Sequence, residues 1–447
     1  MINRFISWCL NNRFLVLLAT FIIVIFGIQA IRNIPVDAIP DIGENQQIVF
    51  VDWPGRDALT IENQITYPLS TRLQGIPGVK TIRASSEFGF SMVYVVFKDN
   101  IDFYWARTRL IEKLQEASKI LPEGVVPTLG PDATGLGQVY WYTVEGDGYT
   151  LAQLRSIQDF YIKYQLQSVE GVAEVASVGG FVKQYQIDVD PNKLATYGIK
   201  FSDVFNAVKS SNIDVGAKVI ERGGMEYIIR GVGFIHSIED LKNIGIKSEN
   251  GTPILLKDIA RIQIGPEFRR GALDKGGKEV VGGVVIVRFK ENPLKVIKRI
   301  KEKIKEIAPG LPPGVKIIPF YDRTELVHRV INTLSDTLIQ EIIFCIVVVL
   351  LLLGHLRSAV VISLGLPVAV IISFIIMYFL KIDSNIMSLG GIAIAIGTLV
   401  DAGIVMTENI HRHAVLYKEK SRIDLILDAA KEVAPAIVTG ILSTIIS

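Results

Sequence analysis

The sequence predicts an α-helical transmembrane bundle joined to a large α+β region outside the membrane. Of its 447 residues 49% are hydrophobic, and the mean hydropathy of +0.38 is high for a soluble protein of this size. The apolar residues gather in runs near the ~20 residues that a helix needs to cross ~30 Å of hydrocarbon. Residues 32–332, between the first two runs, alternate strand-like and helix-like patterns.

Charge and cysteine content exclude several classes of protein. Lys and Arg number 47 and Asp and Glu 45, giving a net charge of +2. No basic footprint for nucleic acid is visible, so no nucleic acid is expected as a partner. The two cysteines, Cys9 and Cys345, are too few for a disulfide scaffold.

Four apolar runs predict transmembrane helices. The first lies within residues 1–32, behind an amphipathic N-terminal segment, and the others are 334–354, 358–380 and 385–410. A cleaved signal peptide is the alternative for the first run, but the run is too long for the apolar core of a signal and no A-x-A site follows it. Residues 411–434 are predicted to form a cytoplasmic loop.

A fifth apolar run, 435–447, is too short to span a bilayer as a helix. We therefore expect it to be the start of a truncated fifth span. The expected explanations are a fragment, a truncated product or a partner chain that supplies the rest.

Short loops set the expected orientation. If there are four spans, most of the basic loop residues lie on one side of the membrane: Arg4 and Arg13, Arg357, and five Lys and Arg residues of 411–434. The opposite loop, 381–385, carries one Lys. The positive-inside rule then places the N-terminus in the cytoplasm and residues 32–332 outside.

The outside region repeats an order of elements. The first copy consists of strand 47–53, helix 58–73 and strands 79–83 and 91–98, and helix 102–120 follows it. The second copy has the same order, with strand 139–144, helix 151–167 and strands 172–178 and 184–190. The turn at 73–79 resembles that at 166–172, at an offset of 93. These features predict duplicated β-α-β units, each helix covering its own sheet. The Gly-rich segment of about 192–276 reads as an inserted subdomain, followed by a strand-helix-strand unit.

Asp401 is the main candidate functional residue of the sequence. It is the one ionisable group within the apolar run 386–406, where a charge costs ~2.5–3.5 kcal/mol and by default marks function. Ala393 and Gly397 precede it at four-residue spacing, so one face carries small residues that admit a neighbouring helix. Because a carboxylic acid in a low-dielectric setting has a raised pKa, it can load and release a proton near neutral pH. A structural Asp that hydrogen-bonds a neighbouring helix stays open as the alternative.

Glu408 lies two helical turns beyond Asp401, on nearly the same face. It is a candidate second proton station, and a solvated carboxylate at the cytoplasmic interface is the alternative. His411 and His413 flank Arg412, and a pair in a basic loop is more often interfacial than metal-binding.

The fourth helix resembles that of a known family. Its run from Gly390 to Gly397, followed by Val400-Asp401-Ala402-Gly403 and Glu408-Asn409, resembles helix four of resistance-nodulation-division transporters. A single Asp followed by Ala is similar to the heavy-metal efflux branch, the Cus/Czc type. Further stretches agree along the whole chain, namely 55–69, 104–107, 130–135, 175–180 and 265–271.

The resemblance implies a homotrimeric proton antiporter, not an enzyme, in the inner membrane of a Gram-negative bacterium. It would act in a tripartite complex with a periplasmic adaptor and an outer-membrane channel, moving heavy-metal cations against protons with no permanently bound cofactor. The resemblance divides the ferredoxin-like periplasmic region into porter subdomain 33–135, porter subdomain 136–190 with 277–333, and docking subdomain 191–276. Asp401 matches the family's proton-relay Asp. The chain would be the N-terminal half, with the main metal site in the other half.

The number and positions of the Met side chains indicate which metal is transported, since Met is a soft ligand. Met387 and Met406 match positions of the methionine relay in copper and silver members, but Leu399 and Phe268 stand where those members have Met. Six Met in all favour divalent Zn, Co or Cd over Cu(I) or Ag(I), which prefer thioethers. Packing roles for both Met residues stay open.

Two other functions are compatible with a membrane-anchored chain of this kind. One is a protein-export accessory subunit of the same superfamily, and the other is a membrane-anchored binding or sensor module with a structural Asp401. An ATP-driven pump is not expected, because the sequence has no P-loop of the form G-x-x-x-x-G-K-[ST].

Overall fold

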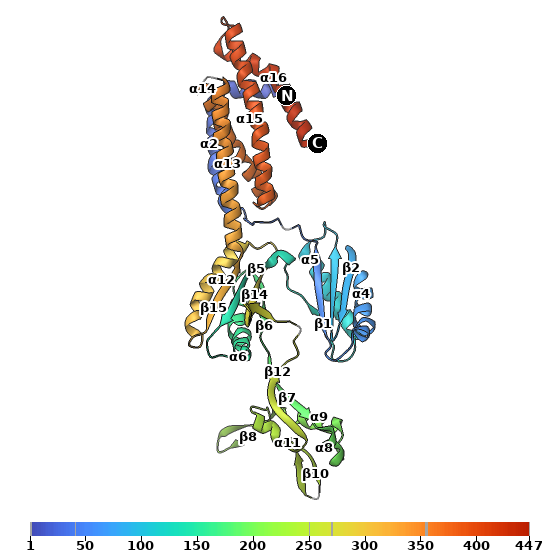
Figure 1. Cartoon of the computed structure of the whole chain (residues 1–447). Helices are drawn as coiled ribbons and strands as arrows, with labels where there is room; N and C mark the ends of the chain where they lie inside the picture. The colour runs from blue at the N-terminus through green and yellow to red at the C-terminus, as the bar shows by residue number, and fades with distance from the viewer. Residues whose placement is uncertain (1, 41, 250, 270, 354–355, 447) are drawn as a thin grey trace.

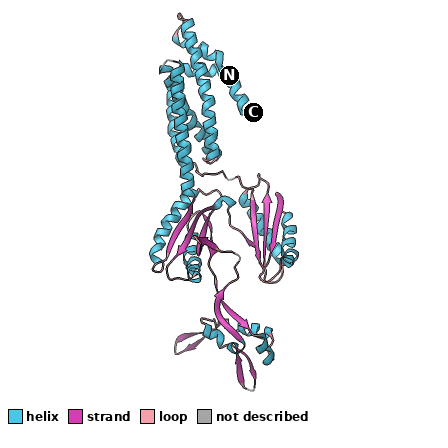
Figure 2. Ribbon diagram, in the orientation of Figure 1, coloured by secondary structure: helices cyan, strands magenta, loops and turns pink. Residues whose placement is uncertain are grey.

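The computed structural model describes residues 2–40, 42–249, 251–269, 271–353 and 356–446. The last residues of the predicted segments 334–354 and 435–447, and Arg270 of the 265–271 stretch, lie outside these ranges. Three parts follow one another along a long axis (Figures 1 and 2): a helix bundle, a pair of sheets with their helices, and a small distal region.

The bundle contains six helices among the described residues. These are α1 (Ile2–Asn11), α2 (Arg13–Asn33), α13 (Arg323–Leu353), α14 (Leu356–Leu380), α15 (Ile386–Leu416) and α16 (Arg422–Ile446). By length and composition α2, the Arg323–Val348 part of α13, and α15 can each cross a membrane, whereas the apolar part of α14 found in the described residues, Leu364–Leu380, is shorter.

Two helices extend beyond the ranges expected from hydropathy. α13 begins at Arg323 rather than near 334, because strand β15 leads directly into it outside the apolar stretch. Residues 411–434 are not mainly a loop, since α15 continues to Leu416 and α16 starts at Arg422. A short turn at 417–421 joins the two helices, which pack against each other, and the buried side of α16 consists of Leu425 and three Ala residues.

The first sheet has the order β2-β3-β1-β4, and its neighbouring strands are antiparallel. Its strands are β1 (Gln46–Asp52), β2 (Val79–Glu87), β3 (Phe90–Phe97) and β4 (Thr128–Leu129). One face packs against a long helix composed of α3 (Ala58–Ile61), η1 (Glu62–Thr66) and α4 (Tyr67–Gln74), and against α5 (Phe103–Ala117). This core is built from alternate strand residues such as Val93, Val95 and Phe97, each fully buried.

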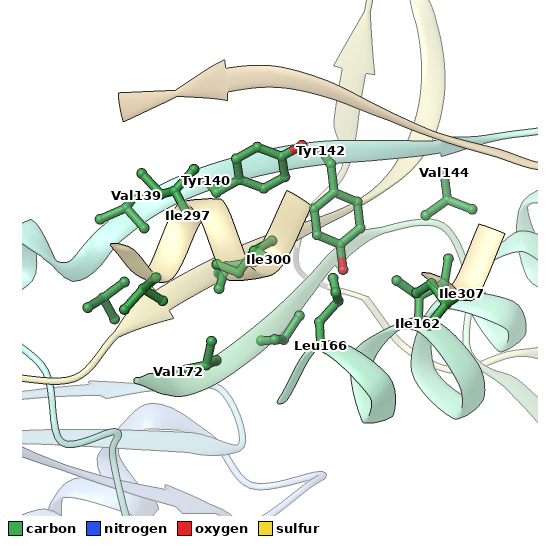
Figure 3. Packing of buried hydrophobic residues seen from close by; sticks show 14 of the residues in the cluster. Val139, Tyr140, Tyr142, Val144, Ile162, Leu166, Val172, Ile297, Ile300 and Ile307 are labelled. Atoms are coloured by element: carbon green, nitrogen blue, oxygen red, sulfur yellow. The ribbon is translucent and has the colours of Figure 1, made fainter. Parts of the chain in front are cut away.

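The second sheet has the order β13-β14-β5-β15, with β6 also paired to β14. The strands are β5 (Gln138–Glu145), β6 (Val172–Gly179), β13 (Leu273–Lys275), β14 (Lys278–Val287) and β15 (Lys316–Asp322). Its helices are α6 (Leu151–Ile157), η4 (Gln158–Ile162), α7 (Lys163–Gln167) and α12 (Pro293–Ile307). Figure 3 shows their shared core, in which the Tyr142 side chain extends from β5 toward the helix that carries Leu166.

The repeated helices share a feature that keeps one face buried. Both contain a π-helical segment, η1 and η4. The buried residues recur at intervals of four, and each differs by 93 from its counterpart: Ile61, Ile65, Leu69 and Leu73 in the first helix, and Leu154, Gln158, Ile162 and Leu166 in the second. A strict spacing of four drifts around a helix of 3.6 residues per turn, and a π turn, with its i→i+5 bonds, takes up this drift.

The repeat ends at β7 (Lys183–Val189). This strand is expected to join the second sheet, but it pairs with β12 (Ala260–Pro266) instead. The place beside β6 is taken by β14, which arrives from later in the chain. The β7–β12 ribbon carries the distal region to the end of the molecule (Figure 1).

The distal region has its own small core, formed around Leu256 and Ile259. Its elements are α8 (Pro191–Thr196), α9 (Phe201–Ser210), β8 (Val215–Arg222), β9 (Met225–Gly231), α10 (Ile238–Lys242), β10 (Gly245–Glu249), β11 (Thr252–Leu255) and α11 (Leu256–Ile259). Three short 3₁₀ turns complete the described chain: η2 (Ser118–Ile120), η3 (Gly135–Gly137) and η5 (Ala308–Gly310).

Candidate functional site on helix α15

Helix α15 places Asp401 near its midpoint. The helix begins at the cap Asn385, whose side-chain oxygen accepts hydrogen bonds from the backbone N–H of Met387 (3.0 Å) and Ser388 (3.1 Å). Its 31 residues make a rod of about 46 Å at 1.5 Å per residue. Asp401 therefore lies about 22 Å from either end of the helix, within its apolar part and closer to the polar end of that part.

One face of α15 packs within the bundle. Its buried residues Leu389, Ile392, Ile396 and Val400 form a cluster with residues of α14 and with Ile34 at the end of α2. Gly403 also faces α14, since a Cβ there would lie 3.1 Å from Ile362. Asp401 is next to Val400 in sequence, and the helical turn directs it away from this buried face.

Asp401 belongs to a stripe that no described part of the chain covers. Met387, Ile394, Asp401 and Glu408 recur every seven residues, and all four are exposed. At Gly390 and Gly397, which accompany this stripe, an added Cβ would meet no described atom within 4 Å. Such spacing with small residues is typical of a helix face that packs closely against another helix.

This geometry permits two kinds of chemistry at Asp401. A carboxylate on an exposed face can exchange a proton with water, or can pair with a cation on a helix that covers the stripe. Glu408, on the same stripe, can do either at the polar end of the helix.

Met387 and Met406 do not form one metal site. They are separated by 19 residues on the continuous helix, a distance of about 28 Å. Met387 is 68% exposed. No group of three or more His, Cys, Asp or Glu side chains suited to a metal ion occurs among the described residues.

The far end of α15 is held by a polar cluster that was not predicted. Glu432 of α16 accepts hydrogen bonds from Arg412 (2.9 Å) and from Asn409 (3.3 Å), and it contacts His413 (2.6 Å). Asn409 is buried and also donates to the carbonyl of Ala429 (2.8 Å). Hydrogen bonds from His413 and Asn409 lower the pKa of the Glu432 carboxyl.

The two histidines, His411 and His413, differ in their relation to this cluster. His413 binds Glu432, whereas His411 is exposed on another side of the helix. Because Asn409 and Glu432 are 23 residues apart, their contact could not be predicted from local sequence. The one indication in the sequence was a polar Asn at the end of an apolar helix.

Comparisons with known proteins identify the family. Residues 5–447 match the model of the AcrB/AcrD/AcrF family. The chain belongs to this family. It is therefore a member of the resistance-nodulation-division transporters, as the motifs around Asp401 imply, and not of an enzyme family.

The similar proteins are heavy-metal efflux systems. The chain is 45% identical to the cation efflux system protein CusA of Escherichia coli K12 over 99% of its own length and 44% of that protein. It is 39% identical to the cobalt-zinc-cadmium resistance protein CzcA of Cupriavidus metallidurans over 98% of its length and 43% of that protein. A crystal structure of a heavy metal efflux pump matches with a TM-score of 0.85 at 32% identity, covering 96% of this chain and 43% of the other.

These matches confirm the predicted resemblance to the heavy-metal branch. The chain spans less than half the length of the relatives it matches.

Proposed function

We propose that this chain forms part of a proton-driven exporter of heavy-metal cations, in which Asp401 carries the proton. The observation behind the proposal is the position of Asp401, midway along an apolar helix and on a small-residue stripe open to a partner helix. A carboxyl group that alternates between water and a packed helix interface changes its preference for the proton as the packing changes. Proton binding and the movement of α15 are then linked.

The surroundings of α15 support its movement as a unit. Its buried face carries no charged group and is apolar except for Asn409, and its far end is fixed to α16 through Glu432. A change at Asp401 therefore acts on a rigid element rather than on a loop. Glu408, on the same stripe, is proposed as the second proton station on the cytoplasmic side.

The parts outside the bundle are assigned by kinship with the heavy-metal pumps. The first and second sheets are proposed as ferredoxin-like porter subdomains, and the distal region as a docking subdomain. The same kinship supports a homotrimer in the bacterial inner membrane, with these regions in the periplasm beside an adaptor and an outer-membrane channel. The lipid bilayer surrounds the bundle.

The cargo is proposed to be a divalent cation such as Zn, Co or Cd. In support, Leu399 and Phe268 stand where the copper and silver members have Met, and the chain has only six Met in all. No resident cofactor is proposed, since the reaction exchanges only a metal ion and protons. Met387 and Met406 stay candidates for separate, single contacts with a passing ion.

The central experiment is Asp401→Asn in the protein as cells produce it. The amide cannot ionise, so metal resistance of a sensitive bacterial strain is expected to fall to that of the empty strain, with normal protein level and assembly. Asp401→Glu keeps a carboxyl group and is expected to retain part of the resistance. Glu112→Gln, at an exposed ion pair on α5, is the matched control and should behave as wild type.

Full resistance in Asp401→Asn cells would refute the proton-carrying role. Growth on Zn, Co, Cd, Cu and Ag tests the cargo in the same strains. Protection against Ag without protection against Zn would contradict the divalent assignment.

A further inference from the structure

Buried Arg323 and partly buried Asp37 form an ion pair where the bundle meets the second sheet. The Asp37 Oδ1 and Arg323 Nε atoms lie 3.0 Å apart, and only 4% of the Arg323 side chain is exposed. Arg323 is the first residue of α13, directly after β15, and its Nη1 donates to the carbonyl of Leu136 ahead of β5. The guanidinium thus holds three separate segments of chain.

Asp37 in turn lies against the start of α15. The segment after α2 forms a β-bridge between Val36 and Ser384, the residue before the cap of α15. The Asp37 N–H donates to the Ser384 carbonyl (3.0 Å), and the Ser384 N–H donates to the Pro35 carbonyl (2.9 Å). On the α15 side of this junction Ser384 and Asn385 are both buried, whereas Pro35 on the other side is exposed.

These contacts make a continuous path from the Asp401 helix to the second sheet. It runs from the α15 cap through the bridge at Val36 to Asp37, and from there to Arg323. Beyond Arg323 it divides into α13 and β5. Figure 1 shows α13 passing without a break from the sheet region into the bundle.

The pair is poorly suited to a purely stabilising role. Arg323 Nη2 is buried and has no hydrogen-bond partner within the described chain. Burial raises the pKa of Asp37 even though Arg323 acts in the opposite direction. Buried ion pairs with unsatisfied groups are weak sources of stability, and apolar residues often serve as well.

Two pockets that open to solvent adjoin the pair. One, of about 240 Å³, is lined by Asp37 together with Leu136 and Glu291. The other, of about 510 Å³, is lined by Arg323 together with Trp141 and Phe320. Side chains that line an open pocket can change conformation without compressing a close-packed core.

From this arrangement we propose that Asp37 and Arg323 are positioning residues that couple displacement of α15 to displacement of the second sheet. The proposal rests on the proposed proton-driven function. The ion pair transmits the movement because it joins the α15 cap to α13 and β5 at one point. Neither residue touches the transported ion or the proton.

The test uses the transporter as cells assemble it, purified and placed in lipid vesicles with a pH gradient. Zn²⁺ and Ag⁺ serve as the two metal probes, and metal transport and proton movement are measured together. Asp37→Asn and Arg323→Gln are each expected to lower metal turnover by about tenfold, the scale of coupling mutations. The KM for the metal and the assembly state should stay unchanged, since the metal site is elsewhere.

Conservative and control variants separate coupling from folding. Arg323→Lys keeps the charge and is expected to regain part of the turnover, while Arg109→Gln, at an exposed ion pair on α5, should match wild type. A second variant with Val36→Cys and Ser384→Cys joins the bridge covalently. Because this bridge is expected to move as one body, cross-linking should leave transport intact.

The outcomes distinguish the two proposals. If the wild type moves no protons with either metal, the proposed function itself fails. If the wild type is active and Asp37→Asn and Arg323→Gln keep full turnover, the coupling role fails alone. Loss of transport on cross-linking Val36 to Ser384 would also overturn the coupling path.

Discussion

Buried hydrogen bonds between the second sheet and its helix segment η4 provide a test of the fold. The Tyr142 hydroxyl donates to Gln158 Oε1 (3.1 Å), and Gln158 Nε2 donates to Ser177 Oγ (3.2 Å). Tyr142 and Gln158 are both fully buried. Burial raises the pKa of the Tyr142 phenol above its usual value, so it stays a neutral donor at working pH.

The perturbation is Tyr142→Phe. It leaves the Gln158 carbonyl oxygen buried without its donor, which costs about 1–3 kcal/mol. Amide exchange that requires opening of β5 should therefore accelerate by about 5- to 150-fold, at tenfold per 1.4 kcal/mol.

Native-state hydrogen exchange of β5 peptides, read by mass spectrometry, measures this effect. The double variant Tyr142→Phe with Gln158→Leu removes both partners and is expected to be less destabilised than the sum of the single variants. Unchanged exchange in Tyr142→Phe, or strict additivity in the double variant, would refute the account.

Two further predictions concern the helix bundle. A Cβ at Gly27 would lie 2.0 Å from Ile371 Cγ2, so Gly27→Ala should separate α2 from α14 and destabilise the bundle by about 1–3 kcal/mol. Adding Ile371→Ala to the Gly27→Ala variant should relieve this clash. Gly440→Ala is the control, because its added Cβ meets no described atom within 4 Å. Thermal unfolding, followed by size-exclusion chromatography, compares the three variants. For Glu432, the lowered pKa means that its stabilising effect is present above the ordinary value of 4.5 and is lost as pH falls through the lowered pKa. The thermal midpoints of wild type and Glu432→Gln should therefore differ at pH 7 and converge in acid, and a constant difference across this range would contradict the assignment.

The sequence by itself determined the class of the protein and the position of its candidate proton site. Apolar run length is a local property, so the helices, and the single acid within the apolar run 386–406, could be located without tertiary information. The order of strands and helices in the outside region was also predictable, because apolar residues recur with a period of 2 in strands and 3.6 in helices, which can be read from neighbouring residues. The buried spacing of four at Ile61, Ile65 and Leu69 was present in the sequence as well, but only the structure showed that a π turn keeps it on one face.

Tertiary structure decided the features that depend on distant residues. Strand β7 alternates like a member of the second sheet, yet its pairing with β12 depends on a segment more than seventy residues later. Helices α13 and α15 continue through polar residues because packing and ion pairs, not hydropathy, set their ends. The Asp37–Arg323 and Asn409–Glu432 contacts have no local signature, since a charge or an amide shows its partner only when the chain has folded around it.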